Sequence, residues 1–186
     1  MTANGDIGAL LLDADEAAAM EVRGRESAVL LALFGWPERP GLIFTERRAD
    51  LRRHAGEVSF PGGRQDPGDA DLEATALREA REEIALDPAG VDVVGALPPV
   101  STFVTGYRIQ PFVGLVAEPA ELGLEPNPTE VETVLAFTLE ALRDGYEMRR
   151  LVRRGVPIHT PTYEVDGQLI WGATARILGD FLKRLG

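Results

Sequence analysis

The sequence predicts a mixed α/β protein built as a single domain over residues 1–186. Segments typical of strands alternate with segments typical of helices along the chain, which is the pattern of a layered α/β fold. No segment repeats, and no low-complexity linker divides the chain. A length of 186 residues is also enough for one hydrophobic core of ordinary size.

The expected elements follow from local patterns. Apolar residues at helical spacing over about residues 8–20 predict a short amphipathic N-terminal helix. Apolar runs at 27–34 and 41–45 predict two strands, with a hairpin as one arrangement, because Gly35 and Pro37 favour a turn between them. A helix is expected at 71–86, which is rich in Ala, Leu, Arg and Glu. Further strands are expected at 91–97, 109–117 and 133–138, and further helices at 139–144 and 171–185.

Composition excludes several classes of function. The formal net charge of −11 predicts repulsion from nucleic acids and anionic membranes, so a bound polyphosphate would need a cation beside it. The chain has no Cys, which excludes disulfides, thiolate metal ligands and a cysteine nucleophile. No basic region precedes the apolar run near the N-terminus and no apolar stretch is long enough for a membrane span, so we expect a cytoplasmic protein.

Three carboxylates on the helix at 71–86 are the main candidates for chemistry. Glu79, Glu82 and Glu83 stand at i, i+3 and i+4, so they share one face within a turn. Like charges at this spacing repel by about 0.2–0.5 kcal/mol per pair, and a hard divalent cation would relieve the repulsion. Mg²⁺ suits such a patch, and Gly62 and Gly63 would let backbone approach it. The alternative is an ordinary solvated helix face.

This loop and helix resemble the Nudix box. Phe60-Pro61-Gly62-Gly63 followed by Arg78-Glu79-Ala80-Arg81-Glu82-Glu83-Ile84-Ala85-Leu86 is similar to the pattern G-x5-E-x7-R-E-U-x-E-E-x-G-U, where U is a bulky aliphatic residue. Fourteen residues instead of thirteen separate Gly63 from Arg78. Asp69 or Ala70, depending on the end from which one counts, replaces the first Glu, and Ala80 and Ala85 replace an aliphatic residue and the last Gly. The box thus spans about residues 63–86.

A second resemblance lies upstream and indicates a branch of this family. Thr45-Glu46-Arg47, Arg52, Gly56 and Phe60-Pro61-Gly62-Gly63 resemble the extended signature L-L-T-x-R-[SA]-x3-R-x3-G-x3-F-P-G-G of the coenzyme A pyrophosphatase branch. Ile43-Phe44 stands in place of the Leu pair, and Arg48 occupies the small-residue position. The resemblance runs from about Ser27 to the segment Trp171-Gly172-Ala173-Thr174-Ala175 and covers most of the chain.

The resemblance implies an α/β/α sandwich with a mixed sheet and a diphosphatase activity. Glu79, Glu82 and Glu83, with the carbonyl of Gly63, would hold Mg²⁺, or Mn²⁺ as the alternative. The catalytic base would be a Glu of the box, Glu82 or Glu83, or Glu130 on a later loop. Bound metal would neutralise diphosphate charge and activate water.

The remaining site candidates have structural or binding roles. Arg78 and Gly62 would be structural, with Arg78 orienting the carboxylates by charge-assisted hydrogen bonds. Arg47 and Arg52 are the candidate substrate-binding residues because they fall on signature positions directly before the catalytic loop. For each arginine, the alternative is an ordinary surface charge.

The expected reaction is hydrolysis of coenzyme A to 4′-phosphopantetheine and adenosine 3′,5′-bisphosphate. Two alternatives stay open. ADP-ribose, NADH or diadenosine polyphosphates offer the same diphosphate chemistry, and a catalytically inactive Nudix protein could instead sense a nucleotide. The intact set Glu79, Glu82 and Glu83 argues against the sensor. No nucleic-acid or membrane partner is expected, and a homodimer is left open.

Overall fold

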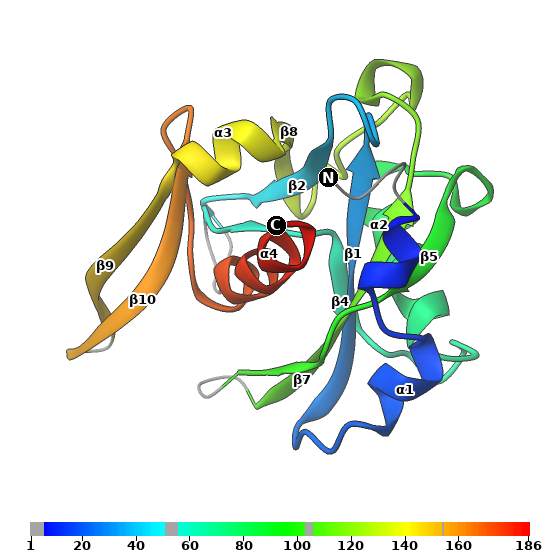
Figure 1. The fold of residues 1–186 in the computed structure, drawn as a ribbon, viewed down its shortest axis with the longest axis horizontal. Helices are drawn as coiled ribbons and strands as arrows, with labels where there is room; N and C mark the ends of the chain where they lie inside the picture. The colour runs from blue at the N-terminus through cyan, green and yellow to red at the C-terminus, as the bar shows by residue number, and fades with distance from the viewer. Residues whose placement is uncertain (1–5, 51–55, 103–105, 154) are drawn as a thin grey trace.

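The computed structural model of this 186-residue chain describes residues 6–50, 56–102, 106–153 and 155–186. Figure 1 shows a sheet with α4 (Gly172–Leu185) in front of it and α2 (Leu72–Ile84) behind it. The strands of this sheet are β1 (Arg25–Phe34), β2 (Gly41–Arg47), β3 (Val58–Ser59), β4 (Gly62–Arg64), β5 (Asp92–Ala96), β6 (Val100–Ser101), β7 (Tyr107–Leu115) and β8 (Val131–Thr138).

The sheet is mixed. Its strand order is β3-β2-β1-β7-β5, with β4 beside β1, β6 beside β7 and β8 beside β2. Strands β1 and β7 run parallel, whereas the other pairs described in this sheet are antiparallel. The turn at Gly35 joins β1 to β2, which pair antiparallel at Leu33 and Leu42, so the expected hairpin is confirmed.

Two apolar cores lie on the two faces of this sheet because successive side chains of β1 point to opposite sides. Leu31 and Leu33 belong to the core that contains Phe181 of α4. Leu30 and Ala32 belong to the core that contains Ala76, Ala80 and Ile84 of α2. The predicted α/β/α sandwich is therefore confirmed. Among the described residues, no helix is long and apolar enough to cross a membrane.

Most predicted elements are present within two residues of their expected ends. The strands expected at 91–97, 109–117 and 133–138 are β5, β7 and β8. The helix expected at 139–144 is α3 (Leu139–Asp144), and those expected at 71–86 and 171–185 are α2 and α4.

The prediction of a single N-terminal helix over about residues 8–20 is wrong. The structure has a 3₁₀ turn at Ile7–Leu10 and a separate helix α1 at Ala14–Ala19. Asp13 separates them because its extended backbone and side chain begin α1 with a capping box shared with Glu16. Leu12 pairs as an isolated β-bridge with Ala96, so the chain is extended where a continuous helix would have passed.

A second sheet has no counterpart among the expected elements. It consists of β9 (Tyr146–Arg153), β10 (Val156–Val165) and β11 (Gln168–Ile170), in the antiparallel order β11-β10-β9. Asp166 and Gly167 both have positive φ, 51° and 78°, in the turn between β10 and β11. An Asp-Gly pair between apolar segments is a strong hairpin signal, which would have located these two strands.

Candidate active site

Helix α2 carries the three carboxylates of the box, and both of its ends are fixed locally. The side chain of Asp71 accepts a hydrogen bond from the backbone N–H of Ala74 at 2.7 Å and caps the first turn. The helix ends at Ala85, whose φ of 57° lies in the left-handed region that favours glycine. Its apolar face packs against β1, which turns the carboxylate-bearing side toward the loop at Gly62 and Gly63.

Arg78 is the centre of a hydrogen-bond network around the box. Its Nε and Nη2 donate to the two carboxylate oxygens of Asp69 at 2.8 and 3.0 Å. Its Nη1 donates to Glu79 Oε1 and to Glu82 Oε2, both at 3.1 Å. A further bond from Nη2 to the carbonyl of Arg64 ties the helix to the preceding loop. One guanidinium therefore orients two of the three box carboxylates.

The same network settles which residue replaces the first Glu of the pattern. Asp69 pairs with Arg78 in bidentate geometry and is almost fully buried, with 6% of its side chain exposed. Ala70 has no carboxylate that could form this pair with Arg78. The guanidinium of Arg78 holds the pKa of Asp69 well below its usual range, against the opposing effect of burial. The additional residue between Gly63 and Arg78 thus follows Asp69, and the pairing with Arg78 is kept.

Glu83 is the most buried carboxylate of the box, with 5% of the residue exposed. Its Oε2 accepts a hydrogen bond from the N–H of Gly62 at 3.2 Å. Burial raises the pKa of Glu83 to about 7; the Gly62 N–H and Arg47 oppose this shift, whereas Glu79 and Glu130 add to it. A buried carboxylate beside two others is a group that a bound cation would stabilise in its charged form.

The backbone of Gly63 lies directly against the carboxylate of Glu79. A methyl group added at this position would overlap the Glu79 carboxyl carbon and Oε1, so no larger residue fits without displacing that side chain. Burial also raises the pKa of Glu79, although Arg78 opposes the shift. The glycine of the pattern therefore lets the Glu79 carboxylate keep its place against the backbone.

Arg47 and Glu130 come from other elements and meet at Glu83. The Arg47 guanidinium, on the last residue of β2, lies 3.7 Å from Glu83 Oε1 and 3.7 Å from Glu130 Oε2. Its Nε is buried without a hydrogen-bond partner. The structure thus brings two of the residues singled out from the sequence, Arg47 and Glu130, to the box. The other candidate arginine, Arg52, lies outside the described residues.

Asn127 is a residue of this region that the sequence patterns did not single out. Its side-chain Nδ2 donates to the carbonyl of Glu82 at 3.2 Å, and its backbone N–H donates to the carbonyl of Glu83 at 2.8 Å. The N–H of Glu130 then donates to the carbonyl of Asn127 at 3.1 Å. The loop therefore binds the open carbonyls at the end of α2 and carries Glu130 to the box. The Asn-Pro-Thr sequence signals a turn, but not its partner.

The donor set fits a hard divalent cation by its chemistry. Within the described ranges, no three His, Cys, Asp or Glu side chains are gathered as a ready-made metal site. Glu82 is turned toward Arg78, and Glu83 toward Arg47, so guanidinium groups balance the carboxylate charges. The available ligand atoms are all oxygens. Two of the carboxylates, Glu79 and Glu83, have raised pKa values, and Gly63 has no side chain that would shield its backbone. These are properties that Mg²⁺ or Mn²⁺ prefers.

Comparisons with known proteins agree with this site. The family model described as NUDIX domain matches residues 24–155, and the chain belongs to the Nudix hydrolase family. Over 164 residues it is 43% identical to the uncharacterized Nudix hydrolase NudL of Cronobacter sakazakii (strain ATCC BAA-894), covering 87% of this chain and 83% of that protein. The corresponding protein of Citrobacter koseri (strain ATCC BAA-895) is 42% identical, again over 87% of this chain and 83% of that protein.

A solved structure supports the fold. The Nudix hydrolase RenU of M. smegmatis superimposes with a TM-score of 0.53 at 21% identity, over 64% of this chain and 74% of that one. At this identity the likeness shows the fold alone. Family membership makes the protein a hydrolase that acts on pyrophosphate bonds, as the box resemblance implied.

Proposed function

We propose that the protein hydrolyses the diphosphate bond of coenzyme A, with Mg²⁺ or Mn²⁺, to 4′-phosphopantetheine and adenosine 3′,5′-bisphosphate. The observation that carries this proposal is the position of Arg47. The coenzyme A branch signature has an arginine at this place, and here its guanidinium lies between Glu83 of the box and Glu130. A residue that belongs to the branch signature, and not to the box itself, therefore borders the reactive carboxylates.

In this proposal, Glu79, Glu82 and Glu83 hold the cation together with the carbonyl of Gly63. Bound Mg²⁺ supplies charge neutralisation and an activated water. Arg78 keeps Glu79 and Glu82 in place through its two hydrogen bonds of 3.1 Å. The N–H of Gly62 fixes the orientation of Glu83.

Glu130 is the proposed general base. Its side chain is 50% exposed, so a water molecule can reach it, and the loop at Asn127 holds it near Glu83. A general base must lie within hydrogen-bond reach of the water that it activates, or one water further away. Glu82 and Glu83 remain the alternatives from the box.

Arg47 and Arg52 are the proposed substrate-binding residues. Arg47 pairs with Glu83 and Glu130 when no substrate is bound, at distances of 3.7 Å that are longer than a charge-assisted hydrogen bond. A diphosphate would offer the guanidinium two oxygens in a geometry that suits it better. This exchange would draw an anionic substrate to a protein whose net charge is −11.

The test is a comparison of coenzyme A, ADP-ribose, NADH and diadenosine tetraphosphate, with Mg²⁺ or Mn²⁺, following products by chromatography. We expect the highest kcat/KM for coenzyme A, with adenosine 3′,5′-bisphosphate as a product. Arg47→Gln should lower kcat/KM for coenzyme A, whereas Arg64→Gln, an exposed arginine beside the same loop, should not. A higher kcat/KM for another substrate would overturn the coenzyme A assignment. Nucleotide binding without turnover would instead favour a sensor.

A further inference from the structure

Strands β9 and β10 form an arm that extends away from the rest of the molecule, at the left of Figure 1. We use the word arm for residues 146–165. The two strands have 8 and 10 residues and pair continuously, from Tyr146 with Tyr163 to Arg153 with Val156. No part of the candidate active site comes from this segment.

The register gives the arm two different faces. Residues opposite each other in an antiparallel pair share a face. One face carries Glu147, Arg149 and Glu164, which form ion pairs of 2.7 and 2.6 Å through Arg149. The other face is largely apolar and carries Tyr146, Met148, Arg150, Val152, Pro157, His159, Pro161 and Tyr163.

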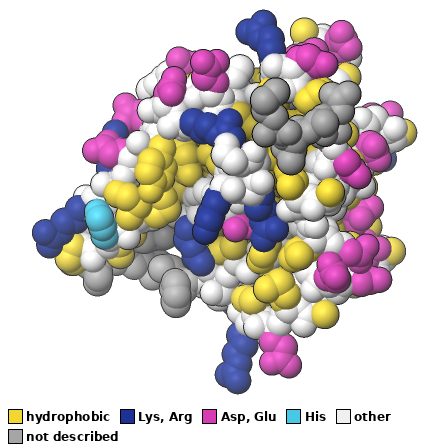
Figure 2. Space-filling model, in the orientation of Figure 1, with side chains coloured by type: hydrophobic (Ala, Val, Ile, Leu, Met, Phe, Trp, Pro, Cys, Tyr) yellow, Lys and Arg dark blue, Asp and Glu magenta, His cyan; other side chains and the backbone are white. Residues whose placement is uncertain are grey.

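Helix α4 covers the base of the apolar face but not the rest. Tyr163 is 3% exposed and its hydroxyl lies against Gly179 of α4. Tyr146, directly opposite Tyr163, is 51% exposed, and further along the same face Met148 and Val152 are 43% and 72% exposed. Figure 2 shows apolar side chains gathered in a patch on this side of the molecule, beside the histidine coloured cyan. The open patch is thus a continuation of a buried face.

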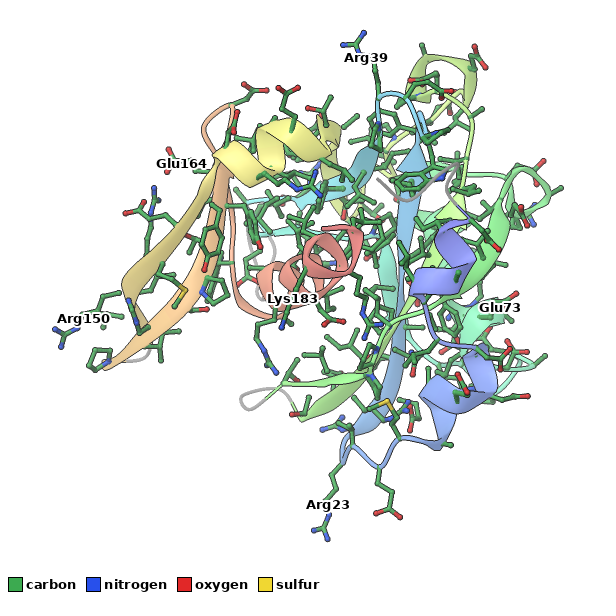
Figure 3. All side chains as sticks on the ribbon, in the orientation of Figure 1. Arg23, Arg39, Glu73, Arg150, Glu164 and Lys183 are labelled. Carbon is green, nitrogen blue, oxygen red and sulfur yellow. The ribbon has the colours of Figure 1, made fainter. Side chains whose placement is uncertain are left out.

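The arm also differs in charge from the rest of the protein. Residues 146–165 contain four Arg and two Glu, a net charge of +2, which leaves −13 for the remainder of the chain. Figure 3 shows Arg150 at the far end of the arm and Glu164 near its base. On the apolar face, Arg150 adds a positive charge to the patch, and an apolar surface with such a charge is suited to an acidic protein surface.

We propose that the apolar face of the arm packs against a second copy of this chain. The body of a second copy is acidic and so complements the arm, whereas the same negative charge would repel nucleic acids and anionic membranes. An interface of ordinary size uses about 20–30 residues a side, so the eight residues of the apolar face would form one part of it and the body surface that receives the partner's arm the rest. A two-fold axis would let each copy place its arm on the other, which closes the assembly as a dimer.

The test is the oligomeric state in solution, measured by analytical ultracentrifugation over a range of protein concentrations. A 20.1 kDa chain should sediment as a dimer, and added NaCl should weaken the dimer because part of the attraction is between charges. Met148→Asp should raise the dimer dissociation constant at least about tenfold, because it places a charge in a desolvated contact. Met20→Asp is the matched control, since Met20 is 41% exposed but lies outside the arm.

Two further variants keep the proposal testable if Met148→Asp alters folding, which circular dichroism would reveal. Val152→Asp changes the most exposed apolar residue of the patch, and Arg150→Glu reverses a charge at its far end; both should dissociate the dimer. A wild-type monomer at the highest soluble concentration would overturn the proposal. So would a dimer that withstands all three arm variants, or one that Met20→Asp dissociates equally.

Discussion

Burial and neighbouring charge give Glu83 properties that its sequence position alone does not. Its pKa of about 7 in the metal-free protein lies above the ordinary value for Glu, chiefly because it is buried. The folded chain therefore binds a proton at Glu83 more tightly than the unfolded chain. Deprotonation of Glu83 therefore lowers the free energy of unfolding as the pH rises from about 4.5 to about 7. A cation that replaces the proton should remove this loss of stability.

Cation binding should therefore depend on pH through Glu83. We predict that Mn²⁺ affinity of the wild-type protein falls as the pH drops below about 7, by up to about tenfold per pH unit, because the proton must leave before the cation binds. Isothermal titration calorimetry over this range measures the effect. In Glu83→Gln the pH dependence should become weaker and most of the affinity should be lost, while the raised pKa of Glu79 leaves some pH dependence. A wild-type affinity that is constant below neutral pH would contradict this account.

The pair of Asp69 and Arg78 should stabilise the folded protein as well as the site. Asp69→Asn leaves a partly buried guanidinium short of its anionic partner, and we predict that the free energy of unfolding falls by about 1–3 kcal/mol at neutral pH. The pKa of Asp69 is depressed, so the wild-type advantage should be present at neutral pH and diminish in acid. Urea unfolding at neutral and at acidic pH measures the free energy of unfolding and its dependence on pH.

Asp66→Asn provides the control for this comparison. It makes the same chemical change at an exposed position of the same loop, and its free energy of unfolding should stay near that of the wild type. Equal decreases in the free energy of unfolding for Asp69→Asn and Asp66→Asn would show that the pairing of Asp69 with Arg78 does not stabilise the folded protein.

At the scale of elements, the end of α2 and the loop before β8 form one unit through Asn127. We predict that Asn127→Ala lowers kcat more than it changes KM, because Glu130 loses its fixed position while Arg47, the proposed substrate-binding residue on β2, stays in place. The matched control is Glu125→Gln, an exposed side chain of the same loop. Steady-state kinetics with the best substrate measures both variants. An unchanged kcat in Asn127→Ala would show that the position of this loop does not affect catalysis.

The elements also show what could be predicted from sequence. Helix α2 has a strongly helix-favouring composition and strands β1, β7 and β8 are apolar segments, and these elements were located within two residues. The helix expected at 8–20 failed because a capping residue, Asp13, and a β-bridge at Leu12 outweigh helical spacing. The arm was missed because its Arg and Pro residues weaken the strand pattern, although Asp166 and Gly167 marked a turn.

The same limits apply to the site. The spacing of Glu79, Glu82 and Glu83 predicts that they share a helix face, because that contact is local. The meeting of Arg47 with Glu83 depends on the pairing of β2 with β1, against which α2 packs, and the bonds from Asn127 depend on a loop 45 residues further along the chain. The family resemblance gave Arg47 only as a candidate substrate-binding residue, so both its contact with Glu83 and the bonds from Asn127 needed the structure.

For the molecule as a whole, we expect function to depend on concentrating positive charge at one place in an acidic protein. The chain carries a net charge of −11, and several of its carboxylates gather at the box. Arg47 and Arg78 balance these charges in the described structure, and a bound cation would take over part of that role. A polyphosphate substrate should therefore bind strongly only when the divalent cation is present.

The measurement that tests this account most directly is Mg²⁺-dependent hydrolysis of coenzyme A by the wild type, Glu83→Gln and Glu73→Gln. Glu73 lies in the first turn of the same helix, six residues before Glu79, and provides the matched control. We predict that Glu83→Gln lowers kcat/KM at least about 100-fold, whereas Glu73→Gln stays within about twofold of the wild type. Activity that survives in Glu83→Gln, or falls equally in Glu73→Gln, would contradict the assignment of this helix face as the catalytic centre.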